Sequence, residues 1–392
     1  MSRPAGVEYE VQGGDYSVAI ARGHDEAGAV LRSAALLGTA SAFQHRIWLT
    51  TWFATAGRHP SVRPLVASIR DGARDQLAML LPLVELREKG RIIIEFADLG
   101  VTDYNAPLLG PAAPHTASGA KRLWSALMRE LPAADAIRLT KMPGKIGTRP
   151  NPLTLLASSR ESQLHGNVVS VASYDSFERE RGRPYRKELE RCWRVFERLG
   201  GTEFRQVGDV EGALGFLRGI EEQQRRRIGA LGLPYILDAP HIASFYRKLV
   251  TDGLGCGYVA MTVLLAGEEV VAALLGLRHG DVFSVLRISN AGEAWKSCSP
   301  GRLVIARTME HLCEEGCTSF DFTTGDYEFK RRLGVELGPL FELTEAKSLW
   351  GVPMAAKAAV KERLFRYPDL ASRLRRLLQR DATGPRLTMA RS

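Results

Sequence analysis

The sequence lacks any apolar run long enough to cross a membrane. A membrane-spanning helix needs roughly 20 consecutive apolar residues, and no segment of the 392 residues approaches that length. The first residues include Glu8, Glu10 and Asp15, so the basic start and apolar stretch of a signal peptide are missing as well. We therefore expect a cytoplasmic protein.

Cysteine is scarce and irregularly spaced. The chain has five cysteines, none of them in a C-x-x-C pair, and this pattern favours neither a disulfide framework nor a zinc ribbon. Cys313 and Cys317 lie four residues apart, but Gly316 lies between them and no histidine follows at ligand spacing. We expect buried thiols, no metal site and no permanently bound cofactor.

The positive charge is concentrated in the C-terminal tail. The chain carries a net charge of +9. Residues 353–392 hold ten Lys/Arg against three acids, so this tail accounts for +7 and the remaining chain for +2. The folded body therefore shows no basic surplus that indicates nucleic-acid binding. The end of the tail is a basic amphipathic segment, which suits an anionic membrane surface, a protein partner or a poorly ordered chain end.

Periodicity predicts a mixed α+β fold. Strands are predicted at residues 16–21, 63–70, 76–86, 90–96, 136–141, 168–172, 202–207, 258–265, 269–277, 282–289, 319–323 and 341–346. Helices are predicted at residues 26–37, 43–55, 117–131, 185–199, 210–227, 241–254 and 300–315, with two short ones in the tail. Short glycine-containing turns join the three strands between residues 258 and 289 into an antiparallel meander. We divide the chain into residues 1–173, 174–350 and 351–392.

A helix start after this meander is a candidate anion site. Ser299 is a favourable N-cap and Pro300 suits the first helical position. The first N–H groups of a helix have no partner within it, so they can bind an anion. Such helix starts are common in globular proteins, and the context decides between the two interpretations.

A loop in the first half of the chain contains two further candidate site residues. Residues 99–107 follow a predicted strand, and glycine, proline and Asn105 keep them from continuing it. A surface turn is the simpler interpretation. Asp103 and Tyr104 also suit a loop that lines a substrate cleft.

The element order and three motifs resemble a known family. The motifs are Asp103-Tyr104, Ser299-Pro300-Gly301 with Leu303, and Phe320-Asp321-Phe322 leading to Gly325-Asp326-Tyr327-Glu328-Phe329-Lys330. The order of strand, helix, long helix, meander, helix start and strand is that of the GNAT acyltransferase fold. Residues 40–345 resemble the acetyltransferases of the cellulose-biosynthesis type, a family of two tandem GNAT-like domains with mixed, mainly antiparallel sheets, related to the FemAB peptidyltransferases.

The resemblance implies an acyl-CoA-dependent N-acyltransferase, specifically an N-acetyltransferase with acetyl-CoA as co-substrate. Its acceptor would be an amino sugar or a precursor of an exopolysaccharide or the cell envelope, free or lipid-linked, handled at the inner face of the membrane. Residues 1–173 would be a degenerate domain on the acceptor side, and residues 174–350 the acyltransferase domain. Two alternatives stay open: a FemAB-like transferase using aminoacyl-tRNA, against which the low charge of the body argues, and a non-catalytic scaffold in polysaccharide synthesis.

The resemblance also implies a binding site for CoA. The pyrophosphate would bind the helix start at Ser299, on the N–H groups of Gly301, Arg302 and Leu303. The pantetheine would add like a strand beside residues 282–289, next to Leu286 and Ile288.

Acyl transfer to an amine needs a base and a group that stabilises the oxyanion. By resemblance to the FemAB group, Lys330 is the candidate for stabilising that charge or an acceptor phosphate, and a solvated helix lysine is the alternative. The candidate bases are Asp321, Asp326 and Glu328, among which the sequence does not choose. The candidate substrate-binding residues are Asp103, Tyr104, Tyr327 and Phe329.

Overall fold

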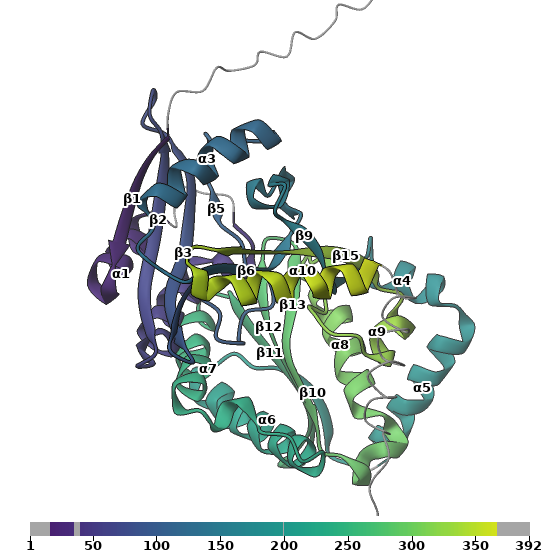
Figure 1. The fold of residues 1–392 in the computed structure, drawn as a ribbon. Coiled ribbons are helices and arrows are strands. Elements are labelled where there is room, and N and C mark those ends of the chain that lie inside the picture. The colour runs from purple at the N-terminus through teal and green to yellow at the C-terminus, as the bar shows by residue number, and fades with distance from the viewer. Residues whose placement is uncertain (1–15, 35–39, 199, 367–392) are drawn as a thin grey trace, which may run out of the picture.

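One long sheet runs through the molecule (Figure 1). The computed structural model describes residues 16–34, 40–198 and 200–366. The strands lie in the spatial order β1 (Tyr16–Arg22), β2 (Val62–Asp71), β3 (Leu77–Glu88), β4 (Arg91–Phe96), β6 (Ala136–Pro143), β15 (Glu336–Ala346), β9 (Arg160–Ser170), β14 (Ser319–Asp321), β13 (Val282–Asn290), β12 (Glu269–His279), β11 (Val259–Ala266) and β10 (Thr202–Gln206). The short β5 (Leu108–Leu109) pairs with β3, and β7 (Lys145–Ile146) pairs with β8 (Arg149–Pro150). The β4/β6 and β13/β14 pairs are parallel, and the other neighbours are antiparallel.

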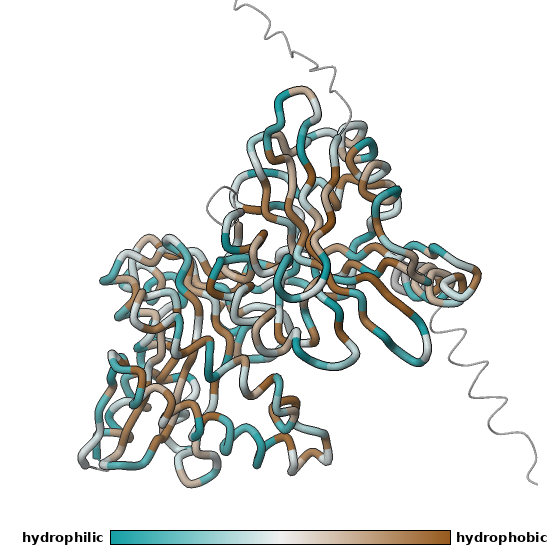
Figure 2. Tube along the Cα trace, turned by 90° about the vertical axis from the view of Figure 1, so that its left-hand side faces the viewer, coloured by the Kyte–Doolittle hydropathy of each residue, from teal (hydrophilic) through white to brown (hydrophobic). Residues whose placement is uncertain are grey.

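Helices cover the sheet on both faces. They are α1 (Gly23–Ala34), α2 (Arg46–Ala54), α3 (Ala117–Glu130), α4 (Tyr174–Arg181), α5 (Arg183–Glu197), α6 (Val210–Ala230), α7 (Pro240–Gly253), α8 (Pro300–Glu314), α9 (Glu328–Leu333) and α10 (Val352–Arg366). In the second half of the sheet, α6 and α7 pack on one face with α2, whereas α5 and α8 pack on the other. Hydrophobic residues follow the central strands, and hydrophilic ones gather at the turns and outer helix faces (Figure 2).

The two halves of the chain are joined through exchanged strands. β15, near the end of the described chain, pairs with β6 through Ala346↔Ala136 and with β9 through Glu336↔Val168. β9 in turn pairs with β14 through Val168↔Asp321. The predicted division at residue 173 therefore separates β9 from both of its neighbours in the sheet, and this division stays a prediction.

The sheet opens where β14 stops. β13 and β14 pair only over Ser284↔Asp321 and the two preceding pairs. β14 ends because Thr323 takes a left-handed conformation with φ of 56°, which an extended strand does not allow. β13 continues to Asn290, so its last six residues have no partner from β14.

The α+β prediction with a mainly antiparallel sheet is confirmed, with differences in several elements. β9 begins at Arg160 and β15 at Glu336, earlier than predicted, and β14 ends at Asp321 instead of residue 323. The structure adds α4, which a capping box of Ser173 and Ser176 starts. The second tail helix and most of the basic segment lie outside the described residues. No helix within the described residues combines the length and apolar character needed to span a membrane.

Candidate active site

A buried carboxylate and a phenol meet at the end of β14. The Tyr104 hydroxyl donates to Asp321 Oδ1 at 2.7 Å, and the Thr323 backbone N–H donates to the same oxygen at 2.7 Å. Both side chains are 8% exposed. Burial raises the pKa of Asp321 to about 6, although the two hydrogen bonds favour its charged form. Burial and the Asp321 charge raise the pKa of Tyr104, so its hydroxyl stays a donor.

A glycine in β9 makes room for this contact. A Cβ atom on Gly166 would lie 2.6 Å from the Tyr104 hydroxyl oxygen, well inside van der Waals contact. The Tyr104 ring packs edge-on against Phe43 at 5.5 Å. The Tyr104 phenol therefore passes close to Gly166 and Phe43, and its hydroxyl reaches Asp321.

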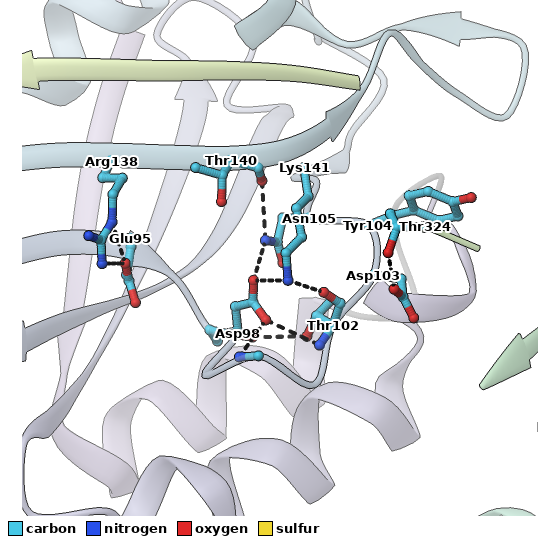
Figure 3. A network of polar contacts seen from close by, with 12 residues as sticks. Glu95, Asp98, Thr102, Asp103, Tyr104, Asn105, Arg138, Thr140, Lys141 and Thr324 are labelled. Atoms are coloured by element: carbon cyan, nitrogen blue, oxygen red, sulfur yellow. Dashed lines mark hydrogen bonds and ion pairs between the residues drawn. The ribbon is translucent and has the colours of Figure 1, made fainter. Parts of the chain in front are cut away.

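An electrostatic network holds the loop that carries Tyr104 (Figure 3). Asp98 Oδ2 accepts from Asn105 Nδ2 at 3.0 Å and pairs with Lys141 Nζ at 2.8 Å. Lys141 also donates to the Thr102 carbonyl oxygen at 2.7 Å. Asn105 Nδ2 also donates to the Thr140 carbonyl oxygen at 3.2 Å, so the loop is tied to β6 on both sides of Asp103.

A cavity of about 230 Å³ lies beside this loop. Its lining includes Glu95, Asp98 and Arg138. Arg138 pairs with Glu95 at 2.6 Å and opposes the rise that burial causes in the Glu95 pKa (Figure 3). Leu99, Gly100 and Asn105 of the predicted 99–107 loop also line this cavity, whereas none of the predicted catalytic, CoA-binding or substrate-binding residues does.

Asp103 reaches the turn that follows β14. Thr324 Oγ1 donates to Asp103 Oδ1 at 2.5 Å (Figure 3). Burial raises the pKa of Asp103, and the hydrogen bond from Thr324 and the nearby Lys141 charge oppose this rise. The two neighbours Asp103 and Tyr104 thus both contact the segment that contains Asp321. Their predicted role in binding substrate stays a prediction.

Lys330 lies inside the turn rather than on the surface. Its side chain belongs to α9 and is 3% exposed. Nζ donates to the carbonyl oxygens of Thr323, Thr324 and Gly325 at 3.3, 2.7 and 3.1 Å. Burial lowers the pKa of Lys330 to about 8, while Asp103 and Asp321 oppose this shift. The alternative of a solvated helix lysine is wrong, because three carbonyl groups replace water around the ammonium group.

Asn167 of β9 is a site residue that the sequence reasoning missed. Its Nδ2 donates to the carbonyl oxygens of Thr323 at 2.7 Å and of Gly325 at 3.2 Å. It therefore shares two acceptors with Lys330. No motif surrounds Asn167, and a polar residue between a glycine and a valine gives no local signal of this role.

The other candidates of the 326–329 segment lie at the surface. Asp326 pairs with Arg331, which lowers the Asp326 pKa, and Glu328 pairs with Arg332 at 2.5 Å. Tyr327 is 58% exposed and stacks on Phe329 with ring centroids 6.0 Å apart. The structure therefore brings Asp321, Lys330, Asp103 and Tyr104 together. Asp326, Tyr327 and Glu328 are exposed on the outer side of the turn, whereas Phe329 is half-buried and packs against the cluster of α5 and α8.

The α8 start differs from a standard N-cap. Ser299 is left-handed, with φ of 50°, and its side chain makes no capping bond, so the predicted side-chain cap is wrong. The Ser299 carbonyl accepts from Arg302 N at 2.9 Å and Leu303 N at 3.2 Å. In this first turn, the backbone N–H of Gly301 does not donate to the Ser299 carbonyl. The carboxylate of Glu188 on α5 lies 3.6 Å from the Arg302 guanidinium.

The two strand residues predicted to contact CoA lie beyond the β13/β14 pairing. Leu286 and Ile288 are half-buried on β13. Leu286 packs against the cluster of α6 and α7, and Ile288 against the cluster of α5 and α8. The two side chains therefore lie on opposite faces of the free part of β13.

Comparison with known proteins finds a family match within the second half of the chain. Residues 183–331 match the family described as "Acetyltransferase (GNAT) domain". The solved structure of FemX is similar over 81% of this chain and 95% of its own, with 12% identity and a TM-score of 0.53. The C-terminal domain of a putative lysylphosphatidylglycerol synthetase from Agrobacterium fabrum is similar over 87% and 96%, with 11% identity and a TM-score of 0.51. No curated protein matches the chain. At these identities the structural likeness shows a shared fold.

Proposed function

Because residues 183–331 form a domain of the GNAT acetyltransferase superfamily, we propose that the protein is an acyl-CoA-dependent N-acyltransferase. The observation that carries this proposal is the buried Asp321, whose pKa is raised to about 6, at the point where β13 and β14 part. A base with a pKa near neutrality is suited to accept a proton from an amine. The free part of β13 beside it offers backbone groups to an extended donor.

The chemistry follows from the arrangement around Asp321. The amine nitrogen attacks the thioester carbonyl carbon, the carbon–sulfur bond breaks, and CoA leaves as the thiolate. Asp321 takes the proton that the amine nitrogen loses. Tyr104 and the Thr323 N–H hold Oδ1 in place, which assigns the proton to Oδ2.

Lys330 supplies positive charge close to the reacting atoms. All three of its N–H donors are used by carbonyl oxygens. Lys330 therefore acts on the developing oxyanion through its charge, and it fixes the turn whose Thr323 N–H contacts Asp321. Asp103 fixes the same turn through Thr324.

We assign the acyl donor to the α8 side of β13. Ile288 and the backbone of β13 would contact the pantetheine, and Gly301 and Arg302 the pyrophosphate. An acetyl group and an amino-sugar or envelope-precursor acceptor are the specific proposal, supported by the resemblance to the cellulose-biosynthesis type. FemX and the lysylphosphatidylglycerol synthetase domain share the fold over most of this chain, and they support aminoacyl-tRNA as the alternative donor.

Two measurements on the full chain separate these functions. Isothermal titration should show acetyl-CoA binding at micromolar to submillimolar concentration, and a thiol reagent should report CoA release with a panel of amino sugars. Absence of binding at millimolar acetyl-CoA contradicts the proposal. Salt-sensitive binding of aminoacyl-tRNA without acetyl-CoA binding supports the alternative donor. Binding of acetyl-CoA without thiol release from any amine supports a scaffold.

A further inference from the structure

Arg287 of β13 is a buried cation without a carboxylate partner among the described residues. It is 6% exposed. Its Nε donates to Gln224 Oε1 at 3.1 Å, and Nη2 contacts Gln224 Oε1 and the Tyr235 hydroxyl. Nη1 is shielded from solvent and has no hydrogen-bond partner in the described part of the chain. Two N–H donors of a permanent cation are therefore unused.

The surroundings of Arg287 offset only part of its charge. The guanidinium lies 4.8 Å from the Tyr246 ring and 5.8 Å from the Tyr235 ring. Ring faces and neutral acceptors attract a cation, but an unpaired buried charge is strongly unfavourable, and arginine does not lose its proton in proteins. A bound anion would use the free edge of the guanidinium and remove this imbalance.

A second unused donor lies beside it. Ser289 follows Arg287 by two residues on β13 and is 3% exposed. Alternation along a strand places both side chains on the same face. The Ser289 hydroxyl also has no hydrogen-bond partner among the described residues. These two hydrogen-bond donor groups without partners, on one face of the strand, could both donate to the oxygen atoms of a carboxylate or phosphate.

The strand geometry points these groups toward the acceptor side. The β12/β13 register shifts so that Leu275 pairs with Arg287 and Gly276 with Val285, which leaves Leu286 as the extra residue of a bulge. Arg287 then faces α6, where it contacts Gln224. Ile288, by contrast, packs toward α5 and α8, the side assigned above to CoA.

Arg287 lies within reach of the proposed reacting groups. Ser284 of β13 pairs with Asp321, and three residues of strand span roughly 10 Å. Between them, Thr323 Oγ1 donates to the Val285 carbonyl at 3.3 Å. Burial raises the pKa of Tyr246, the nearby Arg287 charge opposes this rise, and the Asp103 charge adds to it.

We propose that Arg287, together with Ser289, binds a carboxylate or phosphate group of the amine substrate whose amino group reaches Asp321. The acceptor class is thus an anionic amine rather than a neutral amino sugar. This inference rests on the proposed function for the amino group, while the anion site itself is tested by binding alone.

The test uses three probes that share an amine and differ in charge. Isothermal titration compares glucosamine, glucosamine 6-phosphate and muramic acid on the full chain and on the variants R287Q and R226Q. Arg226 is the control, because it is an exposed arginine of α6 paired with Glu222. We expect the wild-type protein and R226Q to bind at least one anionic probe about tenfold or more tightly than glucosamine, and R287Q to lose this preference. The phosphate and carboxylate probes distinguish the two sources of charge.

Each remaining outcome contradicts the inference. Equal or undetectable affinity for the three probes removes the anion site. A preference that survives in R287Q assigns it to another residue. Because an unpaired charge is removed, we expect the Tm of R287Q to equal or exceed that of the wild type; a lower Tm with unchanged preference makes Arg287 a structural residue. The affinity for acetyl-CoA, measured separately, should be the same in R287Q as in the wild type. A loss of this affinity would mean that Arg287 binds the acyl donor and not the acceptor. Acetyl-CoA binding by the wild type tests the proposed function independently.

Discussion

At Asp321, burial and hydrogen bonding act in opposite directions. Two hydrogen bonds favour its charged form, yet burial outweighs them and leaves the pKa at about 6, above the usual 3.8. The folded protein therefore binds a proton at Asp321 more tightly than the unfolded chain does. Stability from this group is complete below pH 3.8 and is lost as the pH rises through 6.

Replacing Asp321 by asparagine should stabilise the protein and inactivate it. The amide oxygen can still accept from Tyr104 and the Thr323 N–H, while the buried charge disappears. The shift of about two pKa units corresponds to a gain of about 3 kcal/mol in the free energy of unfolding at pH 8. Urea unfolding at pH 8 and pH 3.5 measures this gain, which should vanish at the lower pH.

The same variant should lose at least about a hundredfold in turnover, since proton transfer to a positioned base contributes that much. D326N is the matched control, because Asp326 is exposed and paired with Arg331. It should stay within about 0.5 kcal/mol of the wild type. A D321N protein that is both less stable and fully active would contradict this role of the carboxylate.

The pH dependence of turnover should reflect both buried ionisable groups. Activity should rise as Asp321 loses its proton around pH 6, and fall above about pH 8 as Lys330 loses its charge. These limbs describe the coupled pair rather than either residue alone. An initial-rate profile from pH 5 to pH 9.5 at saturating acyl-CoA measures them. A flat profile across pH 6 would exclude Asp321 as the base.

The Tyr104 contact depends on Gly166, and a double-mutant cycle should show their coupling. In G166A the new Cβ would meet the Tyr104 hydroxyl at 2.6 Å, so we expect a loss of about 1–3 kcal/mol in stability. In a Y104F background the hydroxyl is gone and the cost should shrink by at least about 1 kcal/mol. G338A is the control, because Gly338 is the β15 partner of Gly166 and has open space around it. Additive effects of Y104F and G166A would contradict the contact.

At the scale of elements, several groups of the candidate anion site at the α8 start already have partners within the protein. The Ser299 carbonyl uses two of its N–H groups, and the Glu188 carboxylate lies beside Arg302. A CoA pyrophosphate in this position would displace Glu188 from Arg302 or be repelled by it. We therefore expect the Glu188 carboxylate on α5 to weaken anion binding at the α8 start. The Ser-Pro-Gly motif does not reveal this carboxylate.

E188Q should consequently bind acetyl-CoA more tightly than the wild-type protein. Removal of one negative charge near the phosphate position should lower the Kd severalfold at low salt, and screening should reduce the effect at about 0.5 M salt. Isothermal titration at the two salt concentrations measures this difference. The control is E190Q on the same helix, whose carboxylate pairs with Arg186. An unchanged Kd for E188Q would remove the α8 start as the pyrophosphate site.

The sequence predicted elements whose pattern is local and missed those that depend on distant partners. The β2–β3 hairpin and the β11–β13 meander show apolar runs separated by glycine-containing turns, and both are present. The parts of β9 and β15 that were not predicted, residues 160–167 and 336–340, contain Gly166, Gly338 and Pro339, so they resemble loops. They become strands because they pair with each other.

The residues of the candidate site show the same difference between local and distant contacts. The Asp321 and Lys330 motif was visible because its residues are close in sequence. The contact between Tyr104 and Asp321 joins residues 217 positions apart, and Arg287 stood inside a predicted strand without any motif. Single-sequence patterns carry no information on such pairings, since these depend on the order of strands in the sheet.

At the scale of the molecule, the exchanged strands should make the two halves unfold together. β15 supplies the link between β6 and β9, and β9 supplies the link to β14. Residues 174–350 alone would leave β15 without either of its neighbours β6 and β9, and β14 paired with β13 only. We therefore expect the full chain to unfold in one calorimetric transition, and a 174–350 fragment to lack cooperative unfolding by circular dichroism. Two separate transitions in the full chain, or a fragment with the same Tm, would show that each half folds independently and that β9 and β15 only join finished domains.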